Sequence, residues 1–523
     1  MSKINTELTY LGIEFGSTRI KAVLIDDSFS VLASGSYIWE NRLEDGYWTY
    51  SLDDIRNGLQ GAYAELAREV KEKYGETLTT MGAIGISAMM HGYMPFNSSE
   101  ELLVPFRTWR NSTTGVAAEK LTRLFDFKIP QRWSIAHLYQ AMLDNENHVT
   151  ELSYITTLAV YVHYLLTGVR AAGMGEASGM FPLDGNGQYD TKMLDKFDRE
   201  VKAAGYSWDI RAVLPQVSPA GECCGCLTAE GALLLDPSGN LKAGILFCPP
   251  EGDAGTGMTA TDSVLPRTGN VSAGTSIFSM LVLERELPGL YDDIDVVVTP
   301  DGRPVAMVHC NNCCSELDAW VKLFGEFAAL AGREMSAGEL YELLYTNAMR
   351  GDTDCGGVLA YNFLSGEPTL NMTEGRPMYF RTPDSRFNLA NFFRAELYSA
   401  FGLLKMGMDI LFDQGIAADR FTGHGGLFKV RGAAQQLLAD ALNTSVAVNE
   451  TAGEGGAWGM ALLAAYMLLG GGKGLAEWLD KSVFADVESC AAVPDPKGVE
   501  GFSRFMLSYR RGLMAEFVAA GRE

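Results

Sequence analysis

The sequence carries the same short pattern twice, once near its start and once near its middle. Residues 15–25 read FGSTRIKAVLI and residues 273–283 read AGTSIFSMLVL. Each copy is a glycine, two hydroxyl residues and then an apolar, strand-forming run. The copies lie about half of the 523-residue chain apart, and a repeat at half length predicts two related domains. We place these domains at residues 1–264 and 265–523.

The two glycine-led loops have the composition of a phosphate-binding turn. Such a turn points successive backbone N–H groups into one concavity, and neighbouring hydroxyls add donors. An ordinary hairpin turn would explain either copy alone. Because both copies open a half of the chain, phosphate binding is the favoured interpretation.

The segments around the loops predict alternating strands and helices. LTYLGIEF, RIKAVLID and VLASGSYIW are strand-like runs separated by turn residues. A helix should begin near Ser51 and end near Gly75, because apolar residues recur between them at helical spacing. MGAIGISA is a further apolar strand. Later helices are predicted over residues 394–411 and 456–469, and residues 423–429 form a glycine-rich turn.

One carboxylate stands among glycines and small residues, in the stretch CPPEGDAGTGM at residues 248–258. Glycine allows backbone or a ligand to approach closely, so Asp253 could take a proton from a bound hydroxyl. An aspartate in a plain turn is the alternative.

Charge and cysteine content exclude some classes of function. The formal net charge is −23, so the chain has no global basic surface for nucleic acid or anionic lipid. No basic segment followed by a long apolar run opens the sequence, and the most apolar stretch, residues 457–469, is too short to span a bilayer. The nine cysteines are typical of a reduced, cytoplasmic protein.

Several motifs occur together in one order. GIEFGSTRIKAVLID and GNVSAGTSIF are similar to the two phosphate loops of the FGGY carbohydrate kinases, within the actin-like ATPase superfamily. PEGDAGTG stands at the catalytic Gly-Asp motif of that family, and SAMMHGYMPF resembles the Met-His-Gly motif of xylulokinases and some gluconokinases. FRTWRN, GEASGMFPLD, FLSGEPT, GHGGLFKVRGAAQQLLAD and GEGGAWGMALLA follow in the family's order. The resemblance covers nearly the whole chain.

This resemblance implies a fold and a set of functional residues. The fold would be α/β, with two actin-like (ribonuclease H-like) domains of mixed sheets and flanking helices around a central cleft. Asp253 would be the general base, and Glu14 would lie near Mg²⁺. The sugar pocket would be lined by Met90, His91, Gly92, Trp109, Asn111 and Asp253. ATP would be bound by Gly16, Ser17, Thr18, Lys21, Gly274, Thr275, Ser276, Gly425, Gly426 and Lys429. Residues 1–264 would thus carry the sugar side and the first phosphate loop, and residues 265–523 the second phosphate loop and the adenosine site.

Some positions depart from the family's pattern. Glu14 replaces an aspartate, and Asn111 and Thr113 replace an aspartate and an arginine. Met-His-Gly favours ketopentoses, HCNNCC resembles a segment of some gluconokinases, and GGLFK is similar to ribulokinases. We therefore predict an ATP- and Mg²⁺-dependent kinase of a ketopentose such as xylulose. Gluconate, ribulose or another polyol is the alternative substrate.

Two functions of other classes are also compatible with the phosphate loops. These are an actin-like ATPase switch and a catalytically weak sugar sensor. We expect a sugar and ATP as small-molecule partners, neither nucleic acid nor membrane, and leave a homodimer open.

Overall fold

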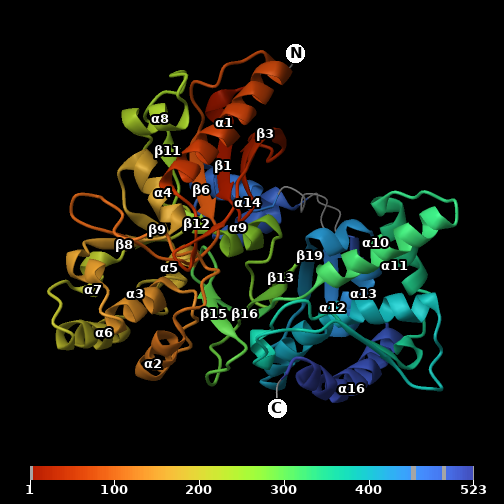
Figure 1. Cartoon of the computed structure of the whole chain (residues 1–523). Coiled ribbons are helices and arrows are strands. Elements are labelled where there is room, and N and C mark those ends of the chain that lie inside the picture. Colours follow the sequence, from red (N-terminus) through yellow and green to blue (C-terminus); the bar gives the residue numbers. More distant parts are fainter. Residues whose placement is uncertain (1–3, 449–454, 486–489, 522–523) are drawn as a thin grey trace. The chain divides into compact units, whose positions relative to one another are not determined.

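The computed structural model describes residues 4–448, 455–485 and 490–521, which form two compact units (Figure 1). Within these residues, the first unit is built from 4–264, 295–305 and 455–485. The second is built from 265–294, 306–448 and 490–521. Two segments from the second half of the chain therefore pack within the first unit. The predicted assignment of sugar to residues 1–264 and nucleotide to 265–523 stays a prediction.

A mixed sheet forms the centre of the first unit, with the strand order β11-β6-β1-β2-β3. β1 pairs antiparallel with β2 and parallel with β6, while β12 adds to the end of β6. These strands are β1 (Tyr10–Phe15), β2 (Arg19–Ile25), β3 (Val31–Ile38), β6 (Ala83–Ala88), β11 (Leu246–Phe247) and β12 (Glu251–Gly252). The predicted succession of three strands, a helix and a further strand is confirmed, with a short strand pair over residues 42–49 inserted before the helix.

The remaining strands of the first unit form short pairs or lie in the 295–305 segment. They are β4 (Arg42–Glu44), β5 (Tyr47–Thr49), β7 (Met94–Phe96), β8 (Tyr154–Thr156), β9 (Ala171–Gly173), β10 (Gln216–Ser218) and β15 (Asp295–Val298). Its helices are α1 (Leu52–Tyr74), α2 (Gly115–Phe125), α3 (Ser134–Leu143), α4 (Leu158–Thr167), α5 (Met174–Ser178), α6 (Thr191–Ala203), α7 (Ile210–Val213), α8 (Ala229–Leu235), α9 (Asp253–Ala260), α14 (Gly455–Leu469) and α15 (Leu475–Trp478).

Helix α1 shows how local sequence sets an element. Ser51 caps its start, since the Ser51 side chain accepts from the Asp54 N–H and the Asp54 carboxylate accepts in return. Gly75 ends the helix in the left-handed conformation, with φ of 75°. The face between these ends buries apolar side chains against β3.

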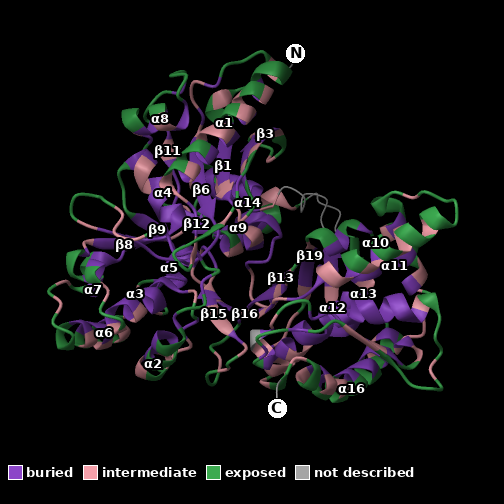
Figure 2. Ribbon diagram, viewed as in Figure 1, coloured by how far each residue is buried: buried purple, intermediate pink, exposed green. Residues whose placement is uncertain are grey.

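Helix α14 reaches the first unit from far along the chain. In Figure 1 this blue helix lies beside the red β1 and the orange β6. The approach is backbone to backbone, because a Cβ on Gly12 would lie 2.0 Å from the Ala457 carbonyl oxygen. Figure 2 shows the strands and α14 as the buried centre of this unit.

The second unit repeats the sheet of the first. Its order includes β16-β14-β13-β19-β20-β21, with β13 antiparallel to β14 and parallel to β19. The strands are β13 (Thr268–Ala273), β14 (Ile277–Val282), β16 (Pro304–Cys310), β19 (Arg420–His424), β20 (Ser445–Val448) and β21 (Cys490–Ala492), with the separate pair β17 (Val358–Tyr361) and β18 (Met378–Arg381). Each sheet thus places a hairpin beside a parallel strand, as the sequence repeat predicts.

Long helices complete the second unit. They are α10 (Cys314–Leu330), α11 (Ala337–Ala348), α12 (Leu389–Asp413), α13 (Ala433–Leu442) and α16 (Pro496–Ala519). The helices predicted over 394–411 and 456–469 correspond to α12 and α14. Among the described residues, no helix combines the length and apolar character needed to cross a bilayer.

Candidate active site

The first predicted phosphate loop is the turn between β1 and β2. The Gly16 N–H closes it on the carbonyl three residues later, 3.0 Å away. The protein holds the loop's carbonyl oxygens: the Trp39 indole donates to Gly16 (2.7 Å), the Tyr50 hydroxyl to Ser17 (2.6 Å), and the Trp39 backbone N–H to Thr18 (3.2 Å). Ser17 is partly exposed and Thr18 is exposed, so both residues are accessible to a ligand.

Glu14 lies on β1, directly across the hairpin from Lys21 on β2. It is half-buried, and a Cβ on Gly456 would lie 2.4 Å from its Oε1 atom. Burial raises the pKa of Glu14 to about 7, and the negative charge of Asp253 adds to that rise, while Lys21 opposes it. The structure therefore brings two of the predicted carboxylates, Glu14 and Asp253, within electrostatic reach of one another.

Asp253 is the first residue of α9 and directly follows β12. Its Oδ1 atom accepts a hydrogen bond from the Met90 backbone N–H, at 3.2 Å. Gly252 makes this approach possible, because a Cβ there would lie 2.0 Å from the Met90 Cγ atom. Although the Asp253 side chain is solvent-accessible, the surrounding protein atoms raise its pKa and the Met90 N–H opposes that rise. Asp253 is thus available to a ligand and held in place.

His91 follows Met90 in a strained turn. Its φ is 71° and that of Gly92 is 91°, and a Cβ on Gly92 would lie 2.8 Å from the Arg107 carbonyl oxygen. The His91 Nδ1 atom lies 3.2 Å from the Gly179 carbonyl oxygen. A carbonyl only accepts, so Nδ1 carries the hydrogen and Nε2 is left as an acceptor. Burial, assisted by the charge of Arg132, lowers the pKa of His91 well below its usual range.

The neighbouring segment holds Trp109 and Asn111. Trp109 is exposed, whereas Asn111 is buried. The Asn111 amide nitrogen donates to the carbonyls of Trp48 (2.9 Å) and Thr108 (3.0 Å), and its oxygen accepts from the Trp48 N–H (2.8 Å). Both amide hydrogens are therefore used by the backbone, and only one lone pair of the oxygen remains for a sugar.

The second predicted phosphate loop, between β13 and β14, is built like the first. The Gly274 N–H closes it on the Ser276 carbonyl, at 2.9 Å. The N–H of Cys314 donates to the Gly274 carbonyl and that of Cys313 to the Thr275 carbonyl, both at 3.0 Å. Again the carbonyl oxygens are held by the protein.

The glycine-rich turn after β19 lies beside this second loop. Gly425 has φ of 101°, and a Cβ there would lie 2.4 Å from the Ala273 carbonyl oxygen. Gly426 and Lys429 are exposed at either end of the short turn that follows. Within the second unit, the structure therefore groups Gly425 with the loop that begins at Gly274.

Two buried carboxylates near Asp253 are absent from the predicted site. Glu251 accepts the backbone N–H groups of Gly175 (3.2 Å) and Glu176 (2.9 Å), and burial raises its pKa to about 7 against these hydrogen bonds. Burial raises the pKa of Glu176 well above its usual range, and the charges of Glu251 and Asp253 add to the rise. In the sequence, both acids stand in glycine-rich segments, which could have marked them as candidate site residues. Only the fold shows that the two segments lie together.

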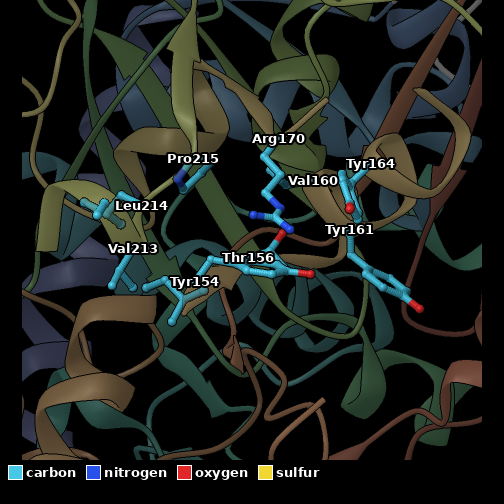
Figure 3. A pocket seen from close by; sticks show the side chains of 11 residues that line it. Tyr154, Thr156, Val160, Tyr161, Tyr164, Arg170, Val213, Leu214 and Pro215 are labelled. Carbon is cyan, nitrogen blue, oxygen red and sulfur yellow. The ribbon is translucent and has the colours of Figure 1, made fainter. Parts of the chain in front are cut away.

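A separate pocket lies elsewhere in the first unit (Figure 3). The Arg170 guanidinium points into it over the Tyr154 ring, 3.6 Å from the ring centroid, and pairs with Glu100 at 3.1 Å. Its volume of about 40 Å³ suits one or a few water molecules. The residues that line it include none of the predicted site residues, so it is not the candidate active site.

Comparison with known proteins identifies the family. Residues 9–238 match the N-terminal domain of the FGGY family of carbohydrate kinases, and residues 269–468 match its C-terminal domain. The chain belongs to this family. It is therefore a sugar kinase, with ATP and a sugar as its substrates.

Individual relatives of this FGGY chain are distant. A xylulose kinase from Haemophilus influenzae is 22% identical over 519 residues, which cover 94% of this chain and 97% of the relative. Solved structures of a xylulose kinase and a gluconate kinase from Lactobacillus acidophilus give TM-scores of 0.79 and 0.78; each is 15% identical and covers 98% of this chain and 99% of the other. A xylulose kinase from Rhodospirillum rubrum gives 0.77 at 19% identity, with the same coverage. At these identities the structural likeness shows the fold alone, and the predicted two-domain α/β fold is confirmed.

Proposed function

We propose that this FGGY kinase phosphorylates a hydroxyl of an uncharged ketopentose such as xylulose, with Asp253 as the general base. The observation that carries the proposal is the Met90–Asp253 hydrogen bond, which holds the carboxylate against the segment that carries His91. Asp253 would take the proton of the sugar hydroxyl while the hydroxyl oxygen forms a bond to the γ-phosphorus. The bond between that phosphorus and the oxygen bridging to the β-phosphate would break at the same time, which releases ADP.

The electrostatics near His91 favour an uncharged sugar over an aldonate. Arg132 is the cation whose charge most lowers the pKa of His91. Arg132 also forms an ion pair with Asp295. The negative charge of Asp295 offsets the attraction that Arg132 would exert on a substrate carboxylate. His91 instead presents Nε2 as an acceptor for a hydroxyl.

The asparagines that resemble a gluconokinase segment also have internal partners. The Asn311 amide donates to the Gly366 carbonyl (3.0 Å), and the Asn312 amide donates to Glu367 (3.1 Å). The Asn312 oxygen accepts the Ser365 N–H, at 2.9 Å. These contacts support a structural role for the segment. Its resemblance to gluconokinases is therefore weaker support for gluconate as the substrate.

The Glu14 carboxylate, which lies within electrostatic reach of the Asp253 carboxylate, fits a role near Mg²⁺. Mg²⁺ is commonly held by one or two carboxylates together with substrate phosphates, and the mutual repulsion of these two groups would be relieved by a cation. The ion would neutralise phosphate charge. We assign the phosphates to the loops at Gly16 and Gly274, and the nucleotide to Gly425, Gly426 and Lys429.

The test combines a substrate screen with two variants. Purified enzyme is assayed for ADP release with ketopentoses, aldonates and polyols. Asp253→Asn keeps an oxygen for the Met90 N–H, so sugar binding should change little while kcat falls by about 10²-fold or more. His91→Ala should raise the sugar KM and leave ATP binding unchanged.

Each outcome bears on a separate part of the proposal. Near-normal turnover by Asp253→Asn would remove that residue as the base. Equal losses of sugar and ATP binding in His91→Ala would make His91 structural. ATP hydrolysis that no sugar stimulates would favour the ATPase switch.

A further inference from the structure

Three short segments of the first unit meet at the proposed sugar side of the site. They are residues 90–92, residues 174–179 with helix α5, and residues 251–253. Two hydrogen bonds described above join the first segment to the others: the Met90 N–H donates to Asp253, and the His91 Nδ1–H donates to Gly179. The turn at His91 is therefore held from both sides.

Glu251 supplies the third link and closes the ring. Its two oxygens accept the N–H groups of Gly175 and Glu176 at the start of α5, while Gly179, which accepts from His91, directly follows α5. The Glu251 side chain is 1% exposed. Because a buried carboxylate is costly unless it is hydrogen-bonded, these two contacts fix its position tightly.

At three glycines the segments pack so closely that a larger residue would not fit. A Cβ on Gly173 would lie 2.2 Å from one Glu251 oxygen, and one on Gly175 would lie 2.5 Å from the other. A Cβ on Gly179 would lie 2.6 Å from the His91 Nδ1 atom. Close packing of this kind passes a displacement of one segment to the next.

We propose that Glu251 is a positioning residue for sugar binding: it anchors the start of α5 and so fixes the Gly179 carbonyl that orients the His91 ring. Glu251 lies two residues before Asp253 in the same segment. Asp253 has a hydrogen bond of its own from the Met90 N–H, so loss of the Glu251 anchor should act mainly on the His91 ring. This inference rests on the proposed function, because it takes His91 as a sugar ligand.

Glu251→Gln is the primary test. The glutamine oxygen can accept one of the two N–H groups, but its NH₂ group would face the other donor. The start of α5 should shift, and His91 should lose its fixed orientation. We expect the sugar KM to rise about tenfold, which corresponds to about 1.4 kcal/mol, near the worth of one hydrogen bond, while the ATP KM and kcat stay within about threefold.

Asp236→Asn is the matched control. Asp236 is also a buried carboxylate of the first unit, and it accepts the backbone N–H groups of Ser238, Asn240 and Leu241. It has no contact with α5 or His91 in the described structure. This variant should lose stability in thermal unfolding without a change in sugar KM.

A double-mutant cycle separates positioning from general damage. If Glu251 acts through His91, Glu251→Gln should add little to the sugar KM of a His91→Ala enzyme. In Gly175→Ala the added Cβ would crowd the same carboxylate, at 2.5 Å from one of its oxygens. This variant should raise the sugar KM in the same direction, and it keeps the test available if Glu251→Gln folds poorly.

The failures of the inference and of the proposed function are distinguishable. An unchanged sugar KM in both Glu251→Gln and Gly175→Ala, or independent effects of Glu251 and His91 in the cycle, would overturn the inference alone. Near-normal kcat in Asp253→Asn together with an unchanged sugar KM in His91→Ala would instead overturn the proposed function on which the inference rests.

Discussion

A single methyl group on α14 should disturb Asp253 although the two lie on different elements. Gly459 packs against α9, and a Cβ there would lie 2.0 Å from the Thr256 carbonyl oxygen. Both atoms in this contact are fixed by helical backbone, so neither can rotate away. In Gly459→Ala, α9 must move as a body, and Asp253 is its first residue.

The geometry sets the size of the effect. Real Cβ contacts essentially never fall below 3.0 Å, and ordinary contact begins near 3.4 Å, so from 2.0 Å the two helices have to separate by about 1.0–1.4 Å. A misplacement of that size in a catalytic group can cost about 10²-fold in rate. Overpacking should also destabilise the protein by about 1–3 kcal/mol, which the better helix propensity of alanine offsets by about 1 kcal/mol.

The assay compares kcat, both KM values and the thermal midpoint with those of a matched glycine-to-alanine variant. Gly325 lies inside α10, and a Cβ there would meet only the end of the Leu340 side chain, at 3.1 Å. Gly325→Ala should be neutral or slightly stabilising, with normal kcat. If Gly459→Ala matched this control in both kcat and midpoint, the close backbone contact between α14 and α9 would be refuted.

Two further predictions concern acids of the first unit. Within the described residues neither Glu176 oxygen has a partner at ordinary hydrogen-bond distance. Burial raises the folded pKa of Glu176 well above 4.5, although the nearby Thr157 hydroxyl opposes the rise. The folded state therefore holds this proton more tightly than the unfolded state, and stability falls as pH rises from about 4.5 towards the folded pKa. Glu176→Gln avoids that loss, so in urea titrations its free energy of unfolding relative to wild type should grow between about pH 5 and pH 8, and parallel curves would contradict the raised pKa. Glu14→Gln should raise the Mg²⁺ concentration needed for half-maximal activity by about tenfold with little change in sugar KM; an unchanged Mg²⁺ titration would remove Glu14 from the metal site.

The local sequence was sufficient to predict those elements whose ends and turns are set by residues adjacent in the chain. The cap at Ser51, the left-handed Gly75 and the two glycine-led hairpins each follow from residues adjacent in the chain. The repeat at half length also predicted related sheets. It could do so because strand order follows from the order of hairpins and helices along each half.

Contacts between distant segments could not be predicted from the sequence. No local pattern indicates that α14 lies on β1 or that Glu251 anchors α5, because these contacts depend on glycines that allow a close approach across the fold. Asn111 illustrates the same limit. Its residue type suits a sugar ligand, yet its burial beside Trp48 commits both amide hydrogens to backbone carbonyls.

The two hairpin loops share a further property that bears on anion binding. A phosphate oxygen is attracted by N–H groups and repelled by carbonyl oxygens, so a turn binds it well only if its carbonyls are held elsewhere. In the first loop the side chains of Trp39 and Tyr50 and the Trp39 backbone N–H hold them. In the second loop the backbone N–H groups of Cys313 and Cys314 do so.

The second arrangement has a consequence for helix α10. N–H groups at the start of a helix are unpaired within it and are a common site for phosphate. Here those of Cys313 and Cys314 are bound to the loop carbonyls instead, so the start of α10 serves to shape the loop. Phosphate binding in the second unit should therefore depend on Gly274, Thr275 and Ser276 themselves, and the side chains of Cys313 and Cys314 should be replaceable by serine or alanine at little cost in ATP KM.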